Sequence, residues 1–200
     1  MSRYVIDSQG LKENIEYIKE KAGVPVIGVV KGNGYGFGIC ELTKVLLENG
    51  IKTFAVTEVT DIPVLKEILS DENDILIMRS TCIEAEAKII AENGCIATIG
   101  SSEACRIMNE VSKKLGVKTK CHLKIDTGMG RYGFMPSQIQ EAIDCYKASN
   151  LEFCGIYTHF SSAFRNAELT KAQLTIFKDC INQIQKAGYE TGVAHCSNSP

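Results

Sequence analysis

The sequence has no long run of one charge and no long run of apolar residues. Its 22 Lys and Arg and 24 Asp and Glu leave a formal net charge of −2. Nucleic acids and anionic membranes are bound by clustered basic residues, so we expect neither as a partner. No segment approaches the roughly 18 apolar residues of a membrane-spanning helix, so we expect no membrane contact. Small-molecule chemistry is the class of function that remains.

The cysteines also lack a pattern. Nine are present, but none forms a CxxC pair and no secretory signal precedes them. They are interpreted as reduced, mostly buried thiols of a cytoplasmic protein. His195 is adjacent to Cys196, but neighbours on a strand point to opposite faces. We therefore expect no metal site from His122, His159 or His195.

Two common phosphate-binding motifs are missing from the stretch VVKGNGYGFG, residues 29–38, because it contains neither GxxxxGK[ST] nor GxGxxG. Lys31 directly follows the apolar run VPVIGVV (24–30), which has the length and composition of a strand buried on both faces. Ligands bind at the carboxyl ends of parallel strands. This position predicts a lysine for proton transfer or Schiff-base chemistry. The alternative is a solvated lysine beside glycines that only form a turn.

Apolar runs alternate with amphipathic helical stretches along the whole chain. The expected strands are 24–30, 53–57, 74–78, 95–100, 120–126, 153–160 and 193–199. The expected helices are 8–23, 39–49, 58–69, 82–94, 101–116, 136–148 and 167–187.

Strict alternation implies parallel strands, either in a doubly wound sheet or in a (β/α)8 barrel. The barrel is favoured because polar residues stand at many strand ends rather than at one switch point: Lys31, Thr57, Arg79, Ser101, Asp126, His159 and Ser197. The sequence thus predicts one α/β domain over residues 1–200. It is a TIM-type barrel truncated to about seven of its eight strands.

A second glycine-rich loop, LKIDTGMGRYGF (123–134), follows the fifth expected strand. Lys124, Asp126 and Arg131 gather there, and this arrangement brings a guanidinium group to the barrel mouth. The alternative is that Asp126 and Arg131 only pair with each other across the loop.

Four blocks in order resemble the alanine racemase family, whose members carry pyridoxal 5′-phosphate (PLP) on a barrel. They are VVKGNGYGFG, LKIDTGMGRYGF, GIYTHFSSA (155–163) and HCSNS (195–199). The resemblance implies that Lys31 carries PLP covalently and acts as one of two catalytic bases. Tyr35 matches a tyrosine that reaches the cofactor phosphate, and His159 matches a histidine stacked near the pyridine ring. Arg131 matches an arginine that contacts the phenolic oxygen of the cofactor and orients the substrate carboxylate.

The resemblance also assigns residues outside these central roles. Ser199, with the backbone near Asn198, matches a phosphate ligand. Lys124 matches a lysine that is carbamylated in several relatives, and the resulting anion would brace Arg131, which an unmodified lysine would repel. Met78 lies where the family places an apolar residue near the ring, although a core methionine is the better interpretation.

The family implies a cytoplasmic isomerase that interconverts L- and D-alanine by proton transfer at Cα and supplies D-alanine for the cell wall. In the family, an eighth strand and a C-terminal β-domain complete the site, and a tyrosine base enters the neighbouring subunit. These parts do not lie within the 200 residues, so we expect a homodimer for the parent protein and less than full activity for this chain.

Two alternatives stay open for the function. Gly32, Gly34, Phe37 and Tyr132 depart from the usual family pattern, which leaves a serine or broad-specificity racemase as an alternative. A non-catalytic PLP-binding module is the other alternative, if the natural chain ends here.

Overall fold

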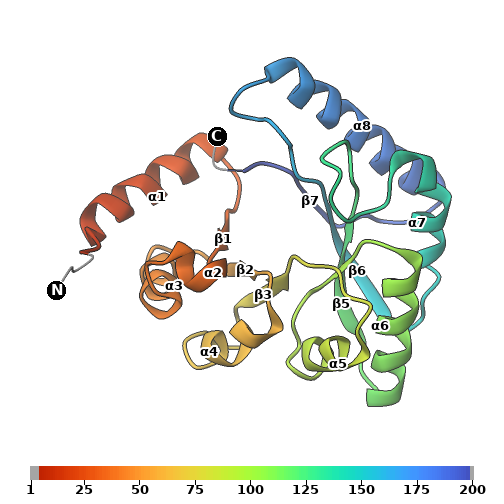
Figure 1. Cartoon of the computed structure of the whole chain (residues 1–200), viewed down its shortest axis with the longest axis horizontal. Helices are drawn as coiled ribbons and strands as arrows, with labels where there is room; N and C mark the ends of the chain where they lie inside the picture. Colours follow the sequence, from red (N-terminus) through yellow and green to blue (C-terminus); the bar gives the residue numbers. More distant parts are fainter. Residues whose placement is uncertain (1–4, 199–200) are drawn as a thin grey trace. The chain divides into compact units, whose positions relative to one another are not determined.

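A computed structural model of the chain describes residues 5–198. The chain divides after Met78 into two compact units. The first contains a three-stranded sheet and the second a four-stranded sheet, and every paired strand runs parallel to its neighbour (Figure 1). The predicted alternation of strands and helices is therefore present in both units.

The first unit has the strand order β1–β2–β3. Its elements are α1 (Ser8–Ala22), β1 (Ile27–Val29), α2 (Lys31–Tyr35), α3 (Ile39–Glu48), β2 (Thr53–Val56), the 3-10 helix η1 (Val59–Asp61), α4 (Ile62–Lys66) and β3 (Asp74–Ile77). Strands β2 and β3 form the centre of this unit. Their apolar residues from Phe54 to Val56 and from Ile75 to Ile77 are almost completely buried. Continuous burial, rather than alternation, is what parallel strands covered on both faces require.

Helix α1 begins after an aspartate cap and ends at a glycine. The carboxylate of Asp7 accepts hydrogen bonds from the backbone N–H groups of Gln9 and Gly10, at 3.1 and 3.0 Å. Gly23 ends the helix in the left-handed conformation, with φ of 61°. These are the preferred residue types for a helix N-cap and for the residue that follows a helix.

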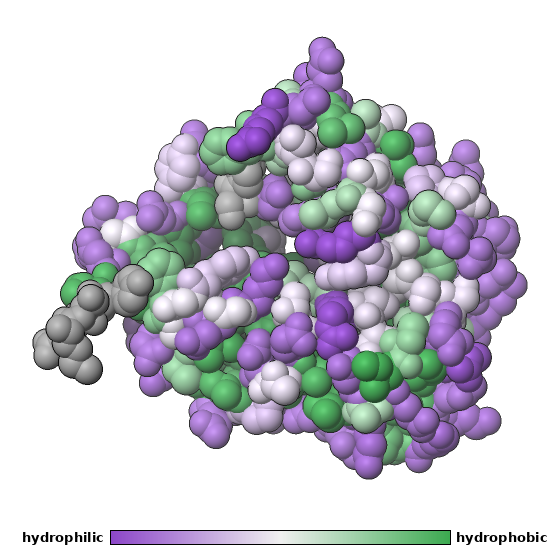
Figure 2. All heavy atoms as spheres, viewed as in Figure 1, coloured by the Kyte–Doolittle hydropathy of each residue, from purple (hydrophilic) through white to green (hydrophobic). Residues whose placement is uncertain are grey.

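The second unit has the strand order β4–β5–β6–β7. Its elements are α5 (Glu84–Glu92), β4 (Ala97–Ile99), α6 (Ser102–Leu115), β5 (Thr119–Lys124), the 3-10 helix η2 (Pro136–Gln138), α7 (Ile139–Cys145), β6 (Leu151–Tyr157), α8 (Ala167–Lys186) and β7 (Val193–His195). Figure 1 shows α6, α7 and α8 arranged along one side of these strands. Figure 2 shows hydrophilic residues along much of the outer side of these helices. Their apolar faces therefore point toward the sheet, as amphipathic helices require.

Glycines let strands β6 and β7 approach their neighbours closely. Gly155 lies opposite His122, where the register between β5 and β6 shifts, and a Cβ at this glycine would overlap the imidazole ring. Gly192, with φ of +66°, precedes β7, and a Cβ there would overlap the backbone carbonyl of Cys154. Both positions require glycine for space, and Gly192 requires it for conformation as well.

Two predicted elements differ from the structure in ways that proline explains. The first strand is Ile27–Val29 rather than 24–30, and Val24 is 64% exposed. Pro25 has no backbone N–H to donate to a neighbouring strand. Within its sheet β1 pairs only with β2, so the side chains of β1 are less buried than predicted. The predicted helix 58–69 is divided into η1 and α4, and Pro63 stands in the first turn of α4.

The structure also bears on the expectations of reduced cysteines and of no membrane-spanning segment. All nine cysteines are free thiols and five of them are buried. Within residues 5–198, no helix combines the length and the apolar character needed to cross a membrane.

The crowding at Gly192 predicts a difference between two glycine-to-alanine variants. Gly116, which ends α6 with φ of +68°, has open space around its missing Cβ. Gly116→Ala should therefore cost only the left-handed strain of about 1–2 kcal/mol in the free energy of unfolding. Gly192→Ala should cost a further 1–3 kcal/mol, roughly, because its Cβ meets backbone atoms. Urea denaturation of both variants measures the difference, and equal losses would contradict the packing described for β7.

Candidate functional site

Lys31 follows the carboxyl end of β1, as predicted. Val30 is fully buried, and its N–H donates to the carbonyl of Ala55 on β2 at 2.9 Å. This bond holds the backbone of the strand end, and the half-buried Lys31 comes directly after it. The lysine side chain has no ion pair or hydrogen bond with any residue that the structure describes. Its amine is thus available to a ligand.

The backbone from residue 32 to 36 forms a left-handed helical turn. Gly32, Asn33 and Gly34 have φ and ψ values near +60° and +45°, and Tyr35 and Gly36 also have positive φ. Hydrogen bonds from the N–H of Gly34 to the carbonyl of Val30 (2.9 Å) and from Gly36 to Gly32 (3.1 Å) stabilise the turn. The glycine-rich stretch after β1 is therefore a regular turn.

Asn33 and Tyr35 are the two non-glycine residues with positive φ in the described chain. Such backbone strain costs roughly 1–3 kcal/mol per residue and is concentrated at functional sites. Asn33 compensates locally, because its Oδ1 accepts a hydrogen bond from the N–H of Ile39 at 3.0 Å, in the first turn of α3. Tyr35 is 61% exposed, so burial of its ring does not offset its strain.

The loop after β5 is organised around the carboxylate of Asp126. Its two oxygens accept hydrogen bonds from four backbone N–H groups, at 2.8–3.2 Å, belonging to Gly128, Met129, Gly130 and Arg131. Burial raises the pKa of Asp126, but these four hydrogen bonds outweigh it, and the net pKa is below the ordinary value. The carboxylate therefore stays ionised and shapes the loop.

Arg131 does not pair with Asp126 through its side chain. Only its backbone N–H reaches the carboxylate, while the exposed guanidinium lies 5.5 Å from the centre of the Tyr132 ring. In the part of the chain described, no ion pair includes Arg131. The alternative of a purely structural Asp126–Arg131 pair is wrong, and the guanidinium is available to an anion.

Lys124, the last residue of β5, is only 2% exposed. Its Nζ donates to the carbonyl of Ile125 at 2.9 Å and lies 5.2 Å from the centre of the Tyr157 ring. The pKa of Lys124 is lowered to about 8, chiefly by burial; the charge of Asp126 opposes this shift and the positive charge of Arg131 adds to it. A substantial fraction of this amine is thus neutral near pH 8, and a neutral amine is a nucleophile.

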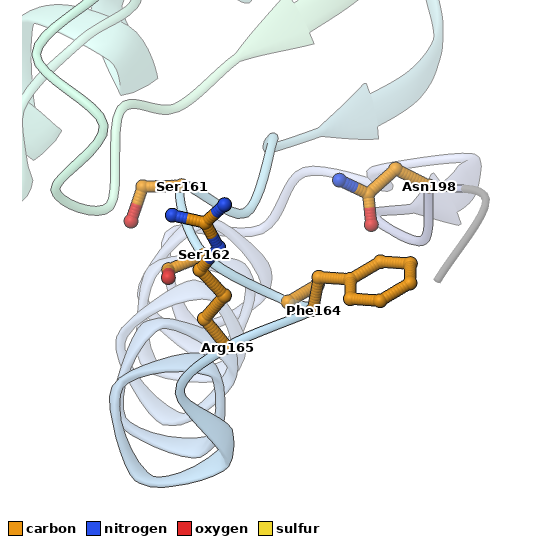
Figure 3. A pocket seen from close by; sticks show the side chains of 6 residues that line it. Ser161, Ser162, Phe164, Arg165 and Asn198 are labelled. Atoms are coloured by element: carbon orange, nitrogen blue, oxygen red, sulfur yellow. The ribbon is translucent and has the colours of Figure 1, made fainter.

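The predicted residues His159 and Asn198 follow the next two strands of the same sheet. His159 comes two residues after β6 and Asn198 three residues after β7, so both stand at the edge where β5 ends in Lys124. Asn198 and the loop after β6 line a pocket of about 300 Å³ (Figure 3). Ser199, the predicted phosphate ligand, lies outside the described residues.

A cluster of buried polar side chains on strands β4 to β7 was not predicted from the sequence. Tyr157 donates or accepts a hydrogen bond with the hydroxyl of Thr98 at 2.9 Å, and its ring stacks on His195 at 4.7 Å between centroids. Nδ1 of His122 and Nε2 of His195 are 2.9 Å apart. The register of the parallel strands pairs Tyr157 with His195, and the only signal in the sequence was the polarity of these residues within apolar runs.

The buried group contains two histidines that the sequence analysis weighed as metal ligands. Burial lowers the pKa of His195 to about 3, with further contributions from His122 and Lys124. Burial also raises the pKa of Tyr157, although the bond to Thr98 opposes this. These pKa shifts keep the side chains of His195 and Tyr157 neutral. Among residues 5–198, no three His, Cys, Asp or Glu side chains are grouped to hold a metal ion.

Comparison with known proteins shows to which family the chain belongs. The family model described as alanine racemase, N-terminal domain, matches residues 6–200. The chain belongs to the alanine racemase family. The alanine racemase of Methanococcus maripaludis is 32% identical over 199 residues, which cover 97% of this chain and 53% of that protein.

Solved alanine racemases confirm the predicted TIM-type fold class. The alanine racemase of Clostridium difficile 630 has a TM-score of 0.87 at 30% identity, over 94% of this chain and 50% of that one. The alanine racemase of Bartonella henselae, solved with covalently bound pyridoxal phosphate, has a TM-score of 0.85 at 23% identity, over 97% of this chain and 56% of that one. The chain thus spans about half the length of the alanine racemases that it matches.

The pKa of Lys124 predicts how stability changes with pH. Between the folded value of about 8 and the ordinary value of 10.5, the unfolded chain holds a proton that the folded chain has released. The free energy of unfolding should therefore rise with pH across this window, by roughly 3 kcal/mol in total. Urea denaturation from pH 7 to 11 of the native chain and of Lys124→Met isolates this contribution, because the other titrating groups are shared. Parallel pH profiles for the two proteins would contradict it.

Proposed function

We propose that the chain is the cofactor-binding portion of a PLP-dependent racemase whose substrate is alanine. The observation that carries the proposal is the amine of Lys31, which has no partner among the described residues and stands between the end of β1 and a strained turn. Membership of the alanine racemase family supports it. The covalent pyridoxal phosphate of the Bartonella henselae relative supports the choice of cofactor.

The residues present fit PLP in charge and chemistry. The cofactor has an aldehyde, which needs an amine, and two anionic oxygen groups, which need donors and cations. Lys31 offers the amine, Arg131 an unpaired guanidinium, and Tyr35 an exposed hydroxyl. Asp126 is the acidic residue of the Arg131 loop, and its oxygens are already occupied by four backbone N–H groups. It therefore does not compete with an anionic ligand for Arg131.

Each predicted residue then has a defined task. Lys31 holds PLP, with Tyr35, His159, Arg131 and the Asn198–Ser199 segment as further contacts. When bound, PLP supplies the electron sink that spreads the negative charge left at Cα when its proton is removed. Nζ of Lys31 takes and returns the proton at Cα on one face, and the guanidinium of Arg131 orients the substrate carboxylate.

The proposal extends to the parent protein. Inversion at Cα needs a second base on the opposite face, and the family implies that a neighbouring subunit supplies it. We therefore propose a homodimer, a cytoplasmic location and a role in supplying D-alanine for the cell wall. Residues 1–200 are proposed as one PLP-binding barrel domain that lacks the eighth strand and the C-terminal β-domain.

The covalent role of Lys31 can be tested without an activity assay. Incubation with PLP should produce near-ultraviolet or violet absorbance, and borohydride should fix the cofactor onto Lys31, as located by peptide mass spectrometry. Lys31→Ala should abolish both signals, because no amine remains at the end of β1. The exposed Lys52, just before β2, is the matched control, and Lys52→Ala should retain them. Reduced cofactor found mainly on other lysines would contradict the proposal.

A second prediction concerns the proposed carbamylation of Lys124. Carbon dioxide adds to a neutral amine, and the low pKa of Lys124 provides one at mildly alkaline pH. The resulting carbamate would replace a buried cation by an anion beside Arg131. Labelled bicarbonate should therefore produce a carbamate signal in carbon NMR spectra that Lys124→Met removes and Lys120→Met retains. A signal that persists unchanged in Lys124→Met would show that another amine is modified.

A further inference from the structure

Helix α8 buries one amide side chain in an otherwise apolar stripe. The buried residues of the helix are Gln173, Phe177, Cys180 and Ile184, which follow one another at intervals of three and four residues. Such a stripe is normally apolar throughout, because a buried amide costs free energy unless it is hydrogen-bonded. Gln173 is only 1% exposed. The packing of the helix alone therefore does not explain why glutamine stands at this position.

The amide of Gln173 joins the loops that follow two neighbouring strands. The N–H and the hydroxyl of Ser161, in the loop after β6, both donate to its Oε1 at 3.1 Å. Its Nε2 donates to the hydroxyl of Thr127, in the loop after β5, at 3.4 Å. A Cβ at Gly128 would lie 3.8 Å from the same Nε2. Both ends of the amide are thus occupied, and the side chain connects one loop to the other.

The two loops are also joined to each other directly. Oγ1 of Thr127 and Oγ1 of Thr158 are 2.8 Å apart, and both threonines are buried. Gln173 extends this junction to α8, so that three elements of the second unit share one buried set of hydrogen bonds. A buried polar network whose members are all bonded makes the structure around it rigid.

Each of the two loops carries a residue proposed for the cofactor. Arg131 stands four residues after Thr127, and His159 stands two residues before Ser161. The carboxylate of Asp126 gives the Arg131 loop its internal shape, through backbone N–H groups of that loop. The amide of Gln173 adds a different constraint, because it determines where the Arg131 loop lies relative to the loop of His159.

We propose that Gln173 is a positioning residue of the cofactor site. It acts through Thr127 and Ser161, and it holds the loops of Arg131 and His159 at the spacing that the ligand requires. Because both loops are in place before the ligand arrives, less free energy is needed to order them on binding. The part of this inference that concerns PLP rests on the proposed function, whereas the part that concerns the two loops does not.

Gln173→Met tests this role, because methionine has a similar length but lacks the amide. Titration with PLP, followed by the absorbance of the bound cofactor, should give a dissociation constant at least about tenfold higher than that of the native chain. A dissociation constant equal to the native one would overturn the inference.

Gln173→Glu gives a second test that does not depend on the folding of Gln173→Met. A protonated carboxyl group can both accept and donate, as the amide does, whereas an ionised one can only accept. Burial favours the protonated form of the new carboxyl group. The affinity of Gln173→Glu for PLP, relative to that of the native chain at the same pH, should therefore be near native at acidic pH and fall as the group ionises. A constant ratio across pH 5 to 9 would contradict the role of the amide N–H.

Ser112→Ala is a matched control that removes buried hydrogen bonds elsewhere in the same unit. Ser112 is fully buried, donates to the carbonyl of Met108 at 2.7 Å and bonds the hydroxyl of Thr119 at 2.6 Å. Thr119 is the first residue of β5, at the opposite end of the strand from Lys124. Ser112→Ala should therefore lower the urea midpoint without changing the dissociation constant of PLP. Equal losses of affinity in Ser112→Ala and Gln173→Met would show a general effect of stability and overturn the positioning role.

Amide hydrogen exchange of the chain without PLP provides a readout that does not depend on the cofactor. Four N–H groups of the Arg131 loop are bound by Asp126 and not by Gln173, namely those of Gly128, Met129, Gly130 and Arg131. They should exchange faster in Gln173→Met, because the loop is no longer held to α8, and at the native rate in Ser112→Ala. Native exchange rates in Gln173→Met would overturn the inference.

Borohydride labelling separates this inference from the proposed function. At saturating PLP, Gln173→Met should still carry the label on Lys31, because positioning changes the affinity and not the reacting amine. Label that avoids Lys31 in the native chain would overturn the proposed function, and the exchange rates would still decide the role of Gln173. Label on Lys31 together with native affinity and exchange in Gln173→Met would overturn the positioning role alone.

Discussion

Parallel pairing of the strands is the constraint that positions the candidate residues. Because a helix returns the chain after each strand, neighbouring strands run in the same direction and their carboxyl ends meet at one edge of the sheet. In the second unit this places Lys124, His159 and Asn198 at the ends of β5, β6 and β7. The hydroxyls of Thr127 and Thr158, 2.8 Å apart, then join the loops after β5 and β6. A rigid sheet thus presents loops that are linked to each other.

The buried polar residues of this sheet determine which group at its edge can react. Tyr157 is hydrogen-bonded to Thr98 and His195 to His122, so these buried side chains have polar partners. Burial also holds both rings neutral, because their pKa values move away from neutral pH in opposite directions. Lys124 experiences the same burial, yet its pKa of about 8 lies within the range where proteins work. It is therefore the residue among these whose charge changes with pH just above neutrality.

Apolar periodicity and loop position allowed much of the fold to be predicted, whereas side-chain pairing between distant strands was not predictable. The strands at 53–57 and 74–78 were predictable because their central residues, 54–56 and 75–77, are all apolar, as burial on both faces requires. The stacking of Tyr157 on His195 depends on the register between β6 and β7, which no local pattern encodes. The hydrogen-bond partners of Asp126 were not predictable for a similar reason. A residue pattern does not show where the backbone N–H groups of a glycine-rich loop point, and here they bind the carboxylate in place of the Arg131 guanidinium.

The left-handed turn after Lys31 shows how strain is distributed between residues with and without a task. Gly32 and Gly34 adopt positive φ without steric cost, and open space surrounds the missing Cβ of Gly32. Asn33 and Tyr35 adopt it at a cost of about 1–3 kcal/mol each. Asn33 recovers part of that cost through its bond to the first turn of α3. No such contact offsets the strain of Tyr35, whose side chain is largely exposed, and this is consistent with the ligand contact proposed for its hydroxyl. The turn is therefore free of backbone strain at its glycines and strained at Asn33 and Tyr35.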